Sequence, residues 1–187
     1  MRKVKYTVAS SLDNFIARPD GAVDWLLNDG TDYGMAEFFK TIDAVLLGRK
    51  TYEFALAHSP KPKQKSKGQK AKGKRTSGTG MKSYVFSRTM KAGTDEDVNI
   101  ISDNAGEFVG NLKSEAGKDI WLMGGGELAK SLFAENLVDE IGLNIHPILL
   151  GTGIQLFPDI GVQIDLELIE YKSHPNGCVQ VTYRVKI

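Results

Sequence analysis

The stretch Asp119-Ile-Trp-Leu-Met123-Gly124-Gly125-Gly126-Glu127-Leu128 decides the fold. Its apolar run from Ile120 to Met123 shows no alternation, which is typical of a strand buried on both faces inside a parallel sheet. Glu127 to Glu135 then has apolar residues at helical spacing on one face. A buried strand that runs through glycines into a helix predicts an open α/β sheet, in which ligands bind beyond the carboxyl ends of the strands.

The three glycines Gly124, Gly125 and Gly126 indicate a possible anion site. The first N–H groups of a helix have no partners within the helix, and its N-terminus carries a partial positive charge. Because glycines have no Cβ atoms, a phosphate can approach this backbone closely. The segment has neither the lysine of a P-loop nor the spaced glycines of the common dinucleotide fingerprint. The glycines alone therefore also fit a tight turn without a ligand.

Two other strand ends carry cations and hydroxyl groups. The apolar run Asp43–Gly48 continues into Arg49, Lys50 and Thr51, and the strand Ser83–Ser87 continues into Arg88 and Thr89. Arginine presents a planar set of donors that matches phosphate oxygens. Each cation taken alone is explained better as a solvated surface charge than as a phosphate ligand. Three such ends together predict a site for an extended dinucleotide, and the excess of cations favours NADPH over NADH.

The remaining elements complete a mixed sheet. Strands followed by helices imply parallel crossovers, whereas the last two strands, joined by the turn Pro175-Asn176-Gly177, must be antiparallel. The expected fold is an α/β three-layer sandwich: a mixed, mostly parallel central sheet with an antiparallel C-terminal hairpin and helices on both faces. Further strands are expected at Val4–Ala9, Val98–Ile101, Val138–Ile145, Ile164–Lys172 and Cys178–Val185, and helices at Asp32–Thr41, Thr51–Ala57 and Ala105–Ala116.

The long loop from Ser10 to Trp25 contains the apolar residues Phe15 and Ile16, so it is expected to fold back onto another part of the protein. Residues 58–82 form a different kind of segment, with nine basic residues and no acidic one. Without apolar periodicity it cannot bury enough surface to offset its ordering entropy. The chain is therefore expected to be one domain, 1–187, with a flexible lysine-rich insertion.

Composition excludes several classes of protein. The 187 residues carry a net charge of +1, which favours neither a nucleic-acid nor a membrane partner. No apolar run is long enough to span a bilayer, and the N-terminus enters a strand without a signal region, so a cytoplasmic protein is expected. The single cysteine, Cys178, fits a packed strand residue. No metal site is expected, because His58, His146 and His174 do not have a metal-ligand spacing.

Several of these motifs resemble a known family. Gly48-Arg49-Lys50-Thr51-Tyr52 resembles the Gly-Arg-x-Thr-aromatic motif of dihydrofolate reductases, and Met123–Gly126 resembles their second glycine motif. Ser11–Ala17 looks like their mobile nicotinamide loop. The segment from Val138 to Phe157 more closely resembles the C-terminal reductase domain of riboflavin biosynthesis, which shares the dihydrofolate-reductase-like fold. The resemblance implies an NADPH-dependent reductase.

The resemblance also assigns cofactor-binding positions. Backbone groups of Ala9 and Ile16 would hold the nicotinamide amide. The resemblance further implies a cis peptide bond between Gly124 and Gly125. The phosphates and adenosine would be held by three groups of residues at the strand ends, which are Gly48, Arg49, Lys50 and Thr51; Ser87, Arg88 and Thr89; and Met123, Gly124, Gly125, Gly126, Glu127 and Leu128.

Three departures from the family leave catalysis open. Riboflavin-pathway reductases have a glutamate before the paired glycines, where this chain has Met123, and a lysine on the first strand, near Thr7 here. Dihydrofolate reductases place their acid on the first helix, at a position that aligns near Met35. Trp25 stands where folate enzymes keep a tryptophan. The candidates for catalysis are therefore Trp25, Asp29, Asp32 and Glu37, although each acid taken alone also fits a solvated surface charge.

The function expected from sequence is hydride transfer from NADPH to a small heterocyclic, carbonyl or imine substrate. One alternative is an NADPH-binding protein without catalysis. Another is a module that binds a polyanion through residues 58–82, although that segment has no aromatic residue to stack on bases. The resemblance also implies a homodimer that forms through the apolar tail around Ile145, Ile148, Leu149, Leu150 and Phe157.

Overall fold

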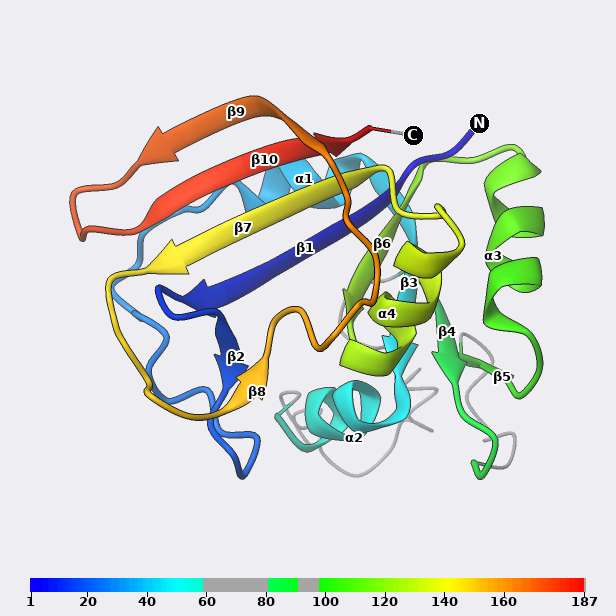
Figure 1. Cartoon of the computed structure of the whole chain (residues 1–187), viewed down its shortest axis with the longest axis horizontal. Helices are drawn as coiled ribbons and strands as arrows, with labels where there is room; N and C mark the ends of the chain where they lie inside the picture. The colour runs from blue at the N-terminus through cyan, green and yellow to red at the C-terminus, as the bar shows by residue number, and fades with distance from the viewer. Residues whose placement is uncertain (59–80, 91–97, 187) are drawn as a thin grey trace, which may run out of the picture.

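The computed structural model describes residues 1–58, 81–90 and 98–186 (Figure 1). Most of the basic insertion, and with it the prediction of its flexibility, lies outside the described residues. The elements are β1 (Val4–Ser11), β2 (Phe15–Ala17), α1 (Met35–Lys40), β3 (Ile42–Gly48), α2 (Arg49–His58), β4 (Lys82–Phe86), β5 (Val98–Ile101), α3 (Ala105–Ser114), β6 (Asp119–Gly124), α4 (Gly126–Ala134), β7 (Glu140–His146), β8 (Ile154–Gln155), β9 (Leu166–Ser173) and β10 (Val179–Val185).

Eight strands form one mixed sheet in the order β5-β4-β3-β6-β1-β7-β10-β9. The pairs from β5 through β7 are parallel, whereas β10 pairs antiparallel with both β7 and β9. The expected parallel sheet with an antiparallel C-terminal hairpin is confirmed. Among the described residues, no helix is both long and apolar enough to cross a membrane.

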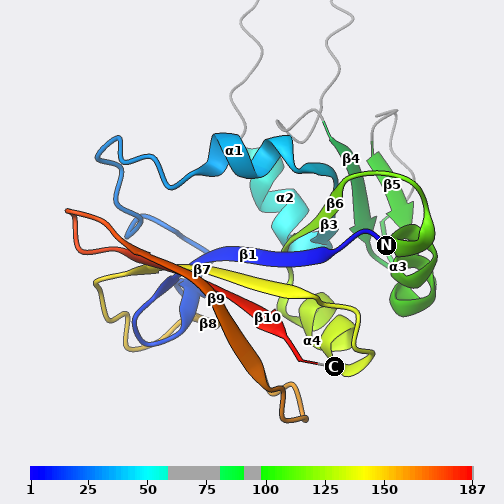
Figure 2. The ribbon, with the colours of Figure 1, turned by 90° about the horizontal axis from the view of Figure 1, so that it is seen from above.

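Helices cover both faces of the sheet, as predicted. Figure 2 shows α1 and α2 on one side and α3 and α4 on the other. The larger hydrophobic cluster joins α3 and α4 to the sheet through residues such as Leu46, Leu122 and Leu132. The smaller cluster lies on the opposite face, where Phe38 and Phe39 of α1 pack on Trp121 with ring centroids 5.7 and 5.6 Å apart. The α/β sandwich is therefore three layers thick.

The long loop folds back as expected, and does so as a strand. Phe15 and Ala17 of β2 pair with β8 in a small second sheet. The carboxylate of Asp13 accepts hydrogen bonds from the N–H groups of Leu150 and Gly151, at 3.1 and 2.7 Å, and from the Ser11 hydroxyl at 2.6 Å. These bonds hold the pKa of Asp13 below its usual range. The loop is thus fixed to the segment that precedes β8.

The sheet has a polar face beyond β6, because polar residues alternate with apolar ones along four adjacent strands. The register places Ala9, Asn144, Gln180 and Lys172 in one row across β1, β7, β10 and β9. The neighbouring row holds Thr7, Gly142, Thr182 and Glu170. The side chains between these rows, such as Val8 and Leu143, point to the other face and pack on the larger cluster. The polar rows therefore face the side on which α1 lies.

Candidate functional site

Two strand ends with glycines meet in the structure. β3 and β6 are neighbours, and Gly48 at the end of β3 lies against Gly125 at the start of α4. A Cβ atom added to Gly125 would lie 2.9 Å from the Gly48 Cα, and one added to Gly48 would lie 3.1 Å from the Gly125 Cα. Glycine at both positions allows this approach, so two glycine motifs that are far apart in the sequence form one structural unit.

The predicted cis bond between Gly124 and Gly125 is wrong, because every peptide bond of the described residues is trans. The chain instead turns through positive φ angles, +155° at Gly124 and +106° at Gly125. Glycine can adopt these torsions, and residues with a Cβ atom rarely do. The sharp change of direction from β6 into α4 thus comes from backbone torsions.

The start of α4 differs from that of α3. In α3 the side chain of Asn104 accepts hydrogen bonds from the N–H groups of Gly106 and Glu107, and so caps the helix. The N-cap of α4 is Gly125, and among the described residues no side chain caps its first N–H groups. These donors remain available for an anion. Leu128 is buried in the core, and Glu127 is exposed.

The adjacent strand end supplies a guanidinium and hydroxyl groups. Arg49, the first residue of α2, donates from Nη1 to Thr89 Oγ1 at 2.7 Å and from Nε to Glu53 at 2.7 Å. Ser87 Oγ accepts from the N–H groups of Thr89 and Met90. Thr51 lies beside Gly124, whereas Lys50 and Arg88 are exposed. The strand ends therefore form one continuous polar edge across β4, β3 and β6.

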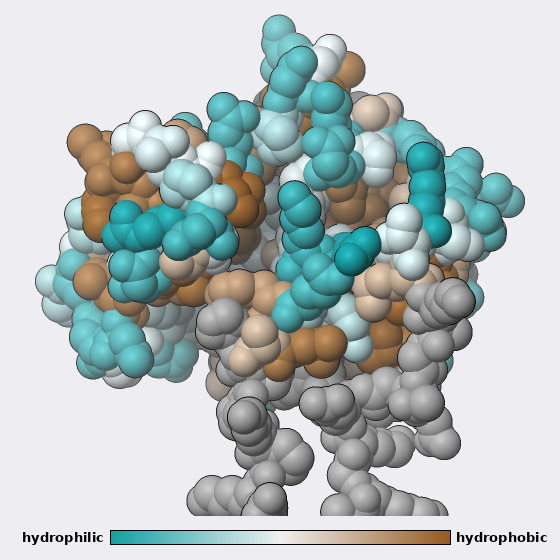
Figure 3. All heavy atoms as spheres, turned by 90° about the horizontal axis from the view of Figure 1, so that it is seen from below, coloured by the Kyte–Doolittle hydropathy of each residue, from teal (hydrophilic) through white to brown (hydrophobic). Residues whose placement is uncertain are grey.

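Sequence analysis missed a fourth strand end in this row. β5 is the neighbour of β4, and Ser87 N–H donates to the carbonyl of Ile101 at 2.9 Å. Beyond Ile101, the residues Ser102 to Asn104 and the first turns of α3 line a depression of about 340 Å³. Figure 3 shows the side of the molecule on which α2 lies in Figure 1, where hydrophilic and hydrophobic residues alternate over the surface.

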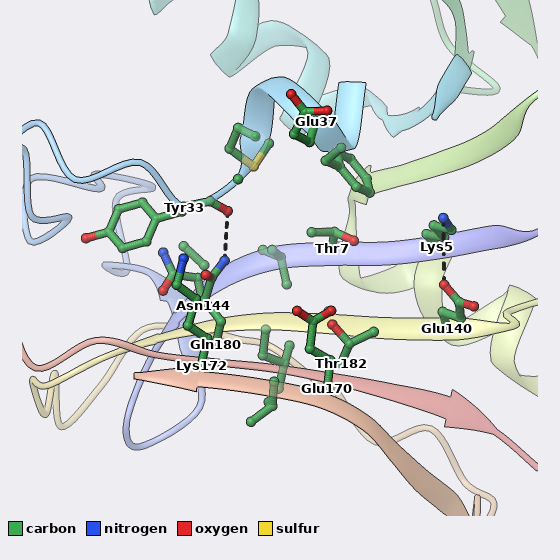
Figure 4. Close-up of a pocket in the computed structure, with 18 of the residues that line it drawn as sticks. Lys5, Thr7, Tyr33, Glu37, Glu140, Asn144, Glu170, Lys172, Gln180 and Thr182 are labelled. Atoms are coloured by element: carbon green, nitrogen blue, oxygen red, sulfur yellow. Dashed lines mark hydrogen bonds and ion pairs between the residues drawn. The ribbon is translucent and has the colours of Figure 1, made fainter. Parts of the chain in front are cut away.

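A larger cavity of about 690 Å³ lies between α1 and the polar face of the sheet. This volume is typical of small-molecule sites. Figure 4 shows Thr7, Asn144, Thr182 and Glu170 on the strands that form its floor, opposite α1. Met35 and Phe38 of α1, together with Trp121 of β6, provide apolar surface. A flat molecule with polar groups on one side suits such a cavity.

Lys5 lies at one end of the cavity. It is on the same face of β1 as Thr7, one row away, and its Nζ lies 2.8 Å from Asp119 Oδ2 and 3.8 Å from Glu140 Oε2 (Figure 4). The first strand thus does carry a lysine on its cavity face, two residues before Thr7. Sequence analysis missed it, although the alternation of β1 contained the signal. Because Asp119 and Glu140 neutralise it, Lys5 adds no net positive charge.

Of the four candidates for catalysis, only Glu37 lines the cavity. Figure 4 shows its carboxylate turned away from the strands of the floor, and the side chain is 76% exposed, with Lys40 Nζ donating to the carboxylate at 2.5 Å. Asp32 accepts from the Gly34 N–H just before α1, and Asp29 accepts from Asn176 Nδ2 at 2.8 Å on the outside of the loop. Hydrogen bonds from the Thr31 side chain, from Asn176 and from the Thr31 N–H lower the pKa of Asp29 to about 2. Trp25 is buried, with its ring edge-to-face on His146 at 5.3 Å.

The end of the cavity beside Trp25 is closed by a network that joins β7, β10 and the loop before α1. His146 Nδ1 accepts from the Leu27 N–H at 3.5 Å and lies 3.5 Å from Cys178 Sγ. The Tyr33 hydroxyl lies 3.5 Å from the same sulfur and accepts from Asn176 Nδ2 at 2.7 Å. Burial lowers the pKa of His146 below its ordinary value, although the charge of Asp29 opposes this.

The cavity and the strand ends with the glycine motifs lie on neighbouring strands. Ala9 lines the cavity, whereas Ile16 of β2 packs against the larger cluster, and Met123 packs against the smaller one. β1 is the neighbour of β6, which carries the glycines. The two regions that the sequence predicts for a cofactor and a substrate therefore lie on adjacent strands.

Comparisons with known proteins agree with this arrangement. The sequence matches the RibD C-terminal domain over residues 2–180. It is 37% identical over 182 residues to the uncharacterized protein YyaP of Bacillus subtilis, covering 97% of this chain and 94% of that protein. It is 34% identical over 169 residues to the uncharacterized protein YwjB of the same organism, covering 89% of each.

Solved structures share the fold. A protein of Shewanella sp. PV-4 ascribed to riboflavin biosynthesis superposes with a TM-score of 0.80 at 23% identity, with all of both chains covered. Dihydrofolate reductase from Enterococcus faecalis, complexed with NADP(H), gives a TM-score of 0.67 at 17% identity over 99% of this chain and 97% of that one. Together with the match to the RibD C-terminal domain, the fold and the strand-end motifs show that this chain belongs to the RibD C-terminal domain family and has a dihydrofolate-reductase-like fold.

Proposed function

We propose that this protein is an NADPH-dependent reductase, which delivers hydride to a C=N or C=O bond of a small heterocyclic or carbonyl substrate. The observation that carries the proposal is the contact between Gly48 and Gly125, because it brings an uncapped helix start and Arg49 to one edge of the sheet. Membership of a reductase family supports the same chemistry.

The residues at this edge fit a dinucleotide with an additional phosphate. Cβ atoms added at Gly48 and Gly125 would press on the facing backbone, so glycine at both positions lets the two strand ends lie together. The N–H groups of Gly126, Glu127 and Leu128 would hold the pyrophosphate. Arg49 and Thr89, already hydrogen-bonded to each other, would hold the additional phosphate together with Ser87, and the exposed Lys50 and Arg88 would add charge.

When bound, nicotinamide supplies a hydride equivalent. The residues of this chain would orient the substrate between Phe38 and the floor around Thr7, with backbone groups of Ala9 and Ile16 beside the nicotinamide. Reduction of a C=N or C=O bond also requires a proton. Glu37 is the acid that we propose for its delivery through water, because Asp29 and Asp32 do not line the cavity and the Glu37 carboxylate is exposed at its rim.

NADPH binding and turnover test the proposal separately. NADPH binding is expected to quench the emission of Trp25 and Trp121, and NADPH oxidation is expected with at least one member of a panel of cyclic imines and carbonyl compounds. Binding without turnover across the panel would favour the cofactor-binding protein without catalysis. Salt-sensitive binding of heparin without any NADPH binding, lost when residues 58–82 are deleted, would favour the polyanion module instead.

We also propose that the protein forms a homodimer, and that strand β9 forms the interface. Of the tail residues named from sequence, Leu149 is exposed, whereas Phe157 packs on the core. The larger exposed apolar surface is the edge strand β9, with Leu166, Leu168, Ile169 and Tyr171 exposed. A long apolar edge strand suits antiparallel pairing with a second copy. Light scattering should give twice the chain mass, and the variant Leu168→Lys should give the monomer mass; a monomeric wild type would refute the dimer.

The protein is proposed to act in the cytoplasm. Cys178, the only cysteine, is buried and unpaired, which suits a reducing compartment. Fractionation of the native cell would test this, and recovery with a membrane or outside the cell would contradict it.

A further inference from the structure

Glu53 is a carboxylate beside the residues proposed to hold the additional phosphate. It lies on α2 four residues after Arg49, so both side chains share one face of the helix. Nε of Arg49 donates to Glu53 Oε1 at 2.7 Å, while Nη1 donates to Thr89 Oγ1 at 2.7 Å. The guanidinium that the proposed function assigns to a phosphate is therefore already paired with a negative charge.

The fold gains little from this ion pair. Both side chains are 49% exposed, and solvent screens a pair at such exposure, so its contribution to stability is small. The order of the two residues is also the weaker one, because a glutamate stabilises a helix more when it precedes the basic residue. The stability of α2 thus gives little reason for a glutamate at position 53.

The start of α2 carries an excess of positive charge that a bound anion would balance. Arg49 and Lys50 are its first two residues, and its first turn has no acidic residue. Cations are unfavourable at a helix N-terminus, where the helix dipole already presents positive charge. Arg88 adds a third cation after β4, and it is exposed like Lys50. Within residues 49–53 and 87–90, Glu53 is the only acidic side chain, so it alone opposes a phosphate there.

Arg49 can bind a phosphate without releasing Glu53. A guanidinium has five N–H donors, and Glu53 and Thr89 use two of those of Arg49. Both Nη atoms therefore keep an N–H for phosphate oxygens. In that arrangement the phosphate and the Glu53 carboxylate share one guanidinium. They repel each other, because a phosphate monoester carries nearly two negative charges at neutral pH.

A ribose hydroxyl has the opposite preference. A carboxylate accepts hydrogen bonds from ribose hydroxyls, whereas an arginine suits a 2′-phosphate, and this contrast separates proteins that bind NADH from those that bind NADPH. Oε1 of Glu53 accepts from Arg49, and its Oε2 has no hydrogen-bond partner among the described residues. Glu53 therefore has an acceptor to offer to the 2′-hydroxyl of NADH.

We infer that Glu53 sets the selectivity between the two cofactors, by weakening the binding of NADPH and supporting the binding of NADH. The wild-type protein then prefers NADPH only modestly, although Arg49, Lys50 and Arg88 lie at this edge of the sheet. This inference rests on the proposed function, since it concerns the same nucleotide site at the strand ends.

Titration calorimetry of the full-length protein with NADPH and with NADH tests this role. Glu53→Gln removes the charge and keeps an amide oxygen that can accept from Arg49 and from a ribose hydroxyl. This variant is expected to bind NADPH about five-fold more tightly than the wild type, and NADH within about two-fold of it.

Glu167→Gln is the matched control, because it removes the same charge at the opposite edge of the sheet. Glu167 is 52% exposed and pairs with Arg184, much as Glu53 is 49% exposed and pairs with Arg49. The control variant should leave both nucleotide affinities unchanged. Thermal unfolding without nucleotide confirms that each variant is folded.

Salt and a second variant separate the charge of Glu53 from its hydrogen bonds. The tighter NADPH binding of Glu53→Gln should shrink from about five-fold at about 50 mM salt to less than about two-fold at about 500 mM, because salt screens exposed charges. Glu53→Leu removes the acceptor as well, and should weaken NADH binding about five-fold. A glutamate that only stabilised α2 would change neither the ratio of the two affinities nor its salt dependence.

The outcomes separate this inference from the proposed function. If neither nucleotide binds the wild type, the proposed function fails, and this inference fails with it. If NADPH binds and the ratio of the two affinities is the same in the wild type and in Glu53→Gln, only the role of Glu53 is overturned. Tighter NADPH binding that persists undiminished at high salt, or a Glu53→Leu variant that binds NADH as the wild type does, would also overturn that role.

Discussion

The contact between Gly48 and Gly125 predicts a large effect for one added methyl group. In Gly125→Ala the new Cβ would lie 2.9 Å from the Gly48 Cα and 3.0 Å from its N atom. Both are backbone atoms of a central strand, so neither can move without disturbing the sheet. Such overpacking costs about 1–3 kcal/mol. A φ of +106° is also unfavourable for alanine, by about 1–3 kcal/mol.

The two costs together destabilise the protein by about 2–6 kcal/mol. For a domain of this size each kcal/mol lowers Tm by about 2–4 °C, so a fall of about 5–20 °C is expected. Calorimetry measures it. The matched control is Gly161→Ala, where φ is +72° and nothing lies within 4 Å of the new Cβ. This variant carries only the torsional cost, about 1–2 kcal/mol. If the two variants lose the same Tm, the proposed contact between the glycine motifs is refuted.

Three further perturbations test separate parts of the structure. Asp29→Asn should lessen acid sensitivity: the native pKa of about 2 lies below the unfolded value, so the contribution of this carboxylate is complete above about pH 4 and is lost as the pH falls toward 2. Urea unfolding across that pH range measures the free energy of unfolding of the wild type and of the variant. A parallel loss in both proteins would contradict this role of Asp29. Asn104→Ala removes the cap of α3 and should cost about 1 kcal/mol, or about 2–4 °C in Tm, whereas an unchanged Tm would exclude the capping role. Asp13→Asn removes an ionised acceptor from the Leu150 and Gly151 N–H groups, and should speed hydrogen exchange at Gly151; unchanged protection would show that the bonds are dispensable.

The elements with strong periodicity could be predicted from sequence. The apolar runs of β3 and β6 are buried on both faces, and the glycines after them end each strand, so their order and direction follow directly. The turn at Pro175–Gly177 similarly fixes the C-terminal hairpin. Helix α1 begins at Met35, three residues later than expected, because Asp32 forms a local turn with Gly34 and delays the helix.

The cavity could not be found from single motifs, because its floor comes from alternate residues of four strands. Lys5, Thr7, Asn144 and Gln180 lie on one face only once the register of β1, β7 and β10 is known. Polar alternation in each of these strands was the available signal. The torsions at Gly124 and Gly125 depend on the approach of β3, which no local pattern encodes.

Cofactor selectivity at the strand ends tests the central claim most directly. NADPH at about one hundred times its Kd should stabilise the protein by about 2.7 kcal/mol, a Tm rise of about 5–10 °C, and NADH at the same concentration should give a smaller rise. In Arg49→Gln the difference between the two nucleotides should shrink, whereas Arg184→Gln, which pairs with Glu167 at the opposite edge of the sheet, should keep it. Equal shifts with both nucleotides in the wild type, or no shift with either, would contradict the assignment.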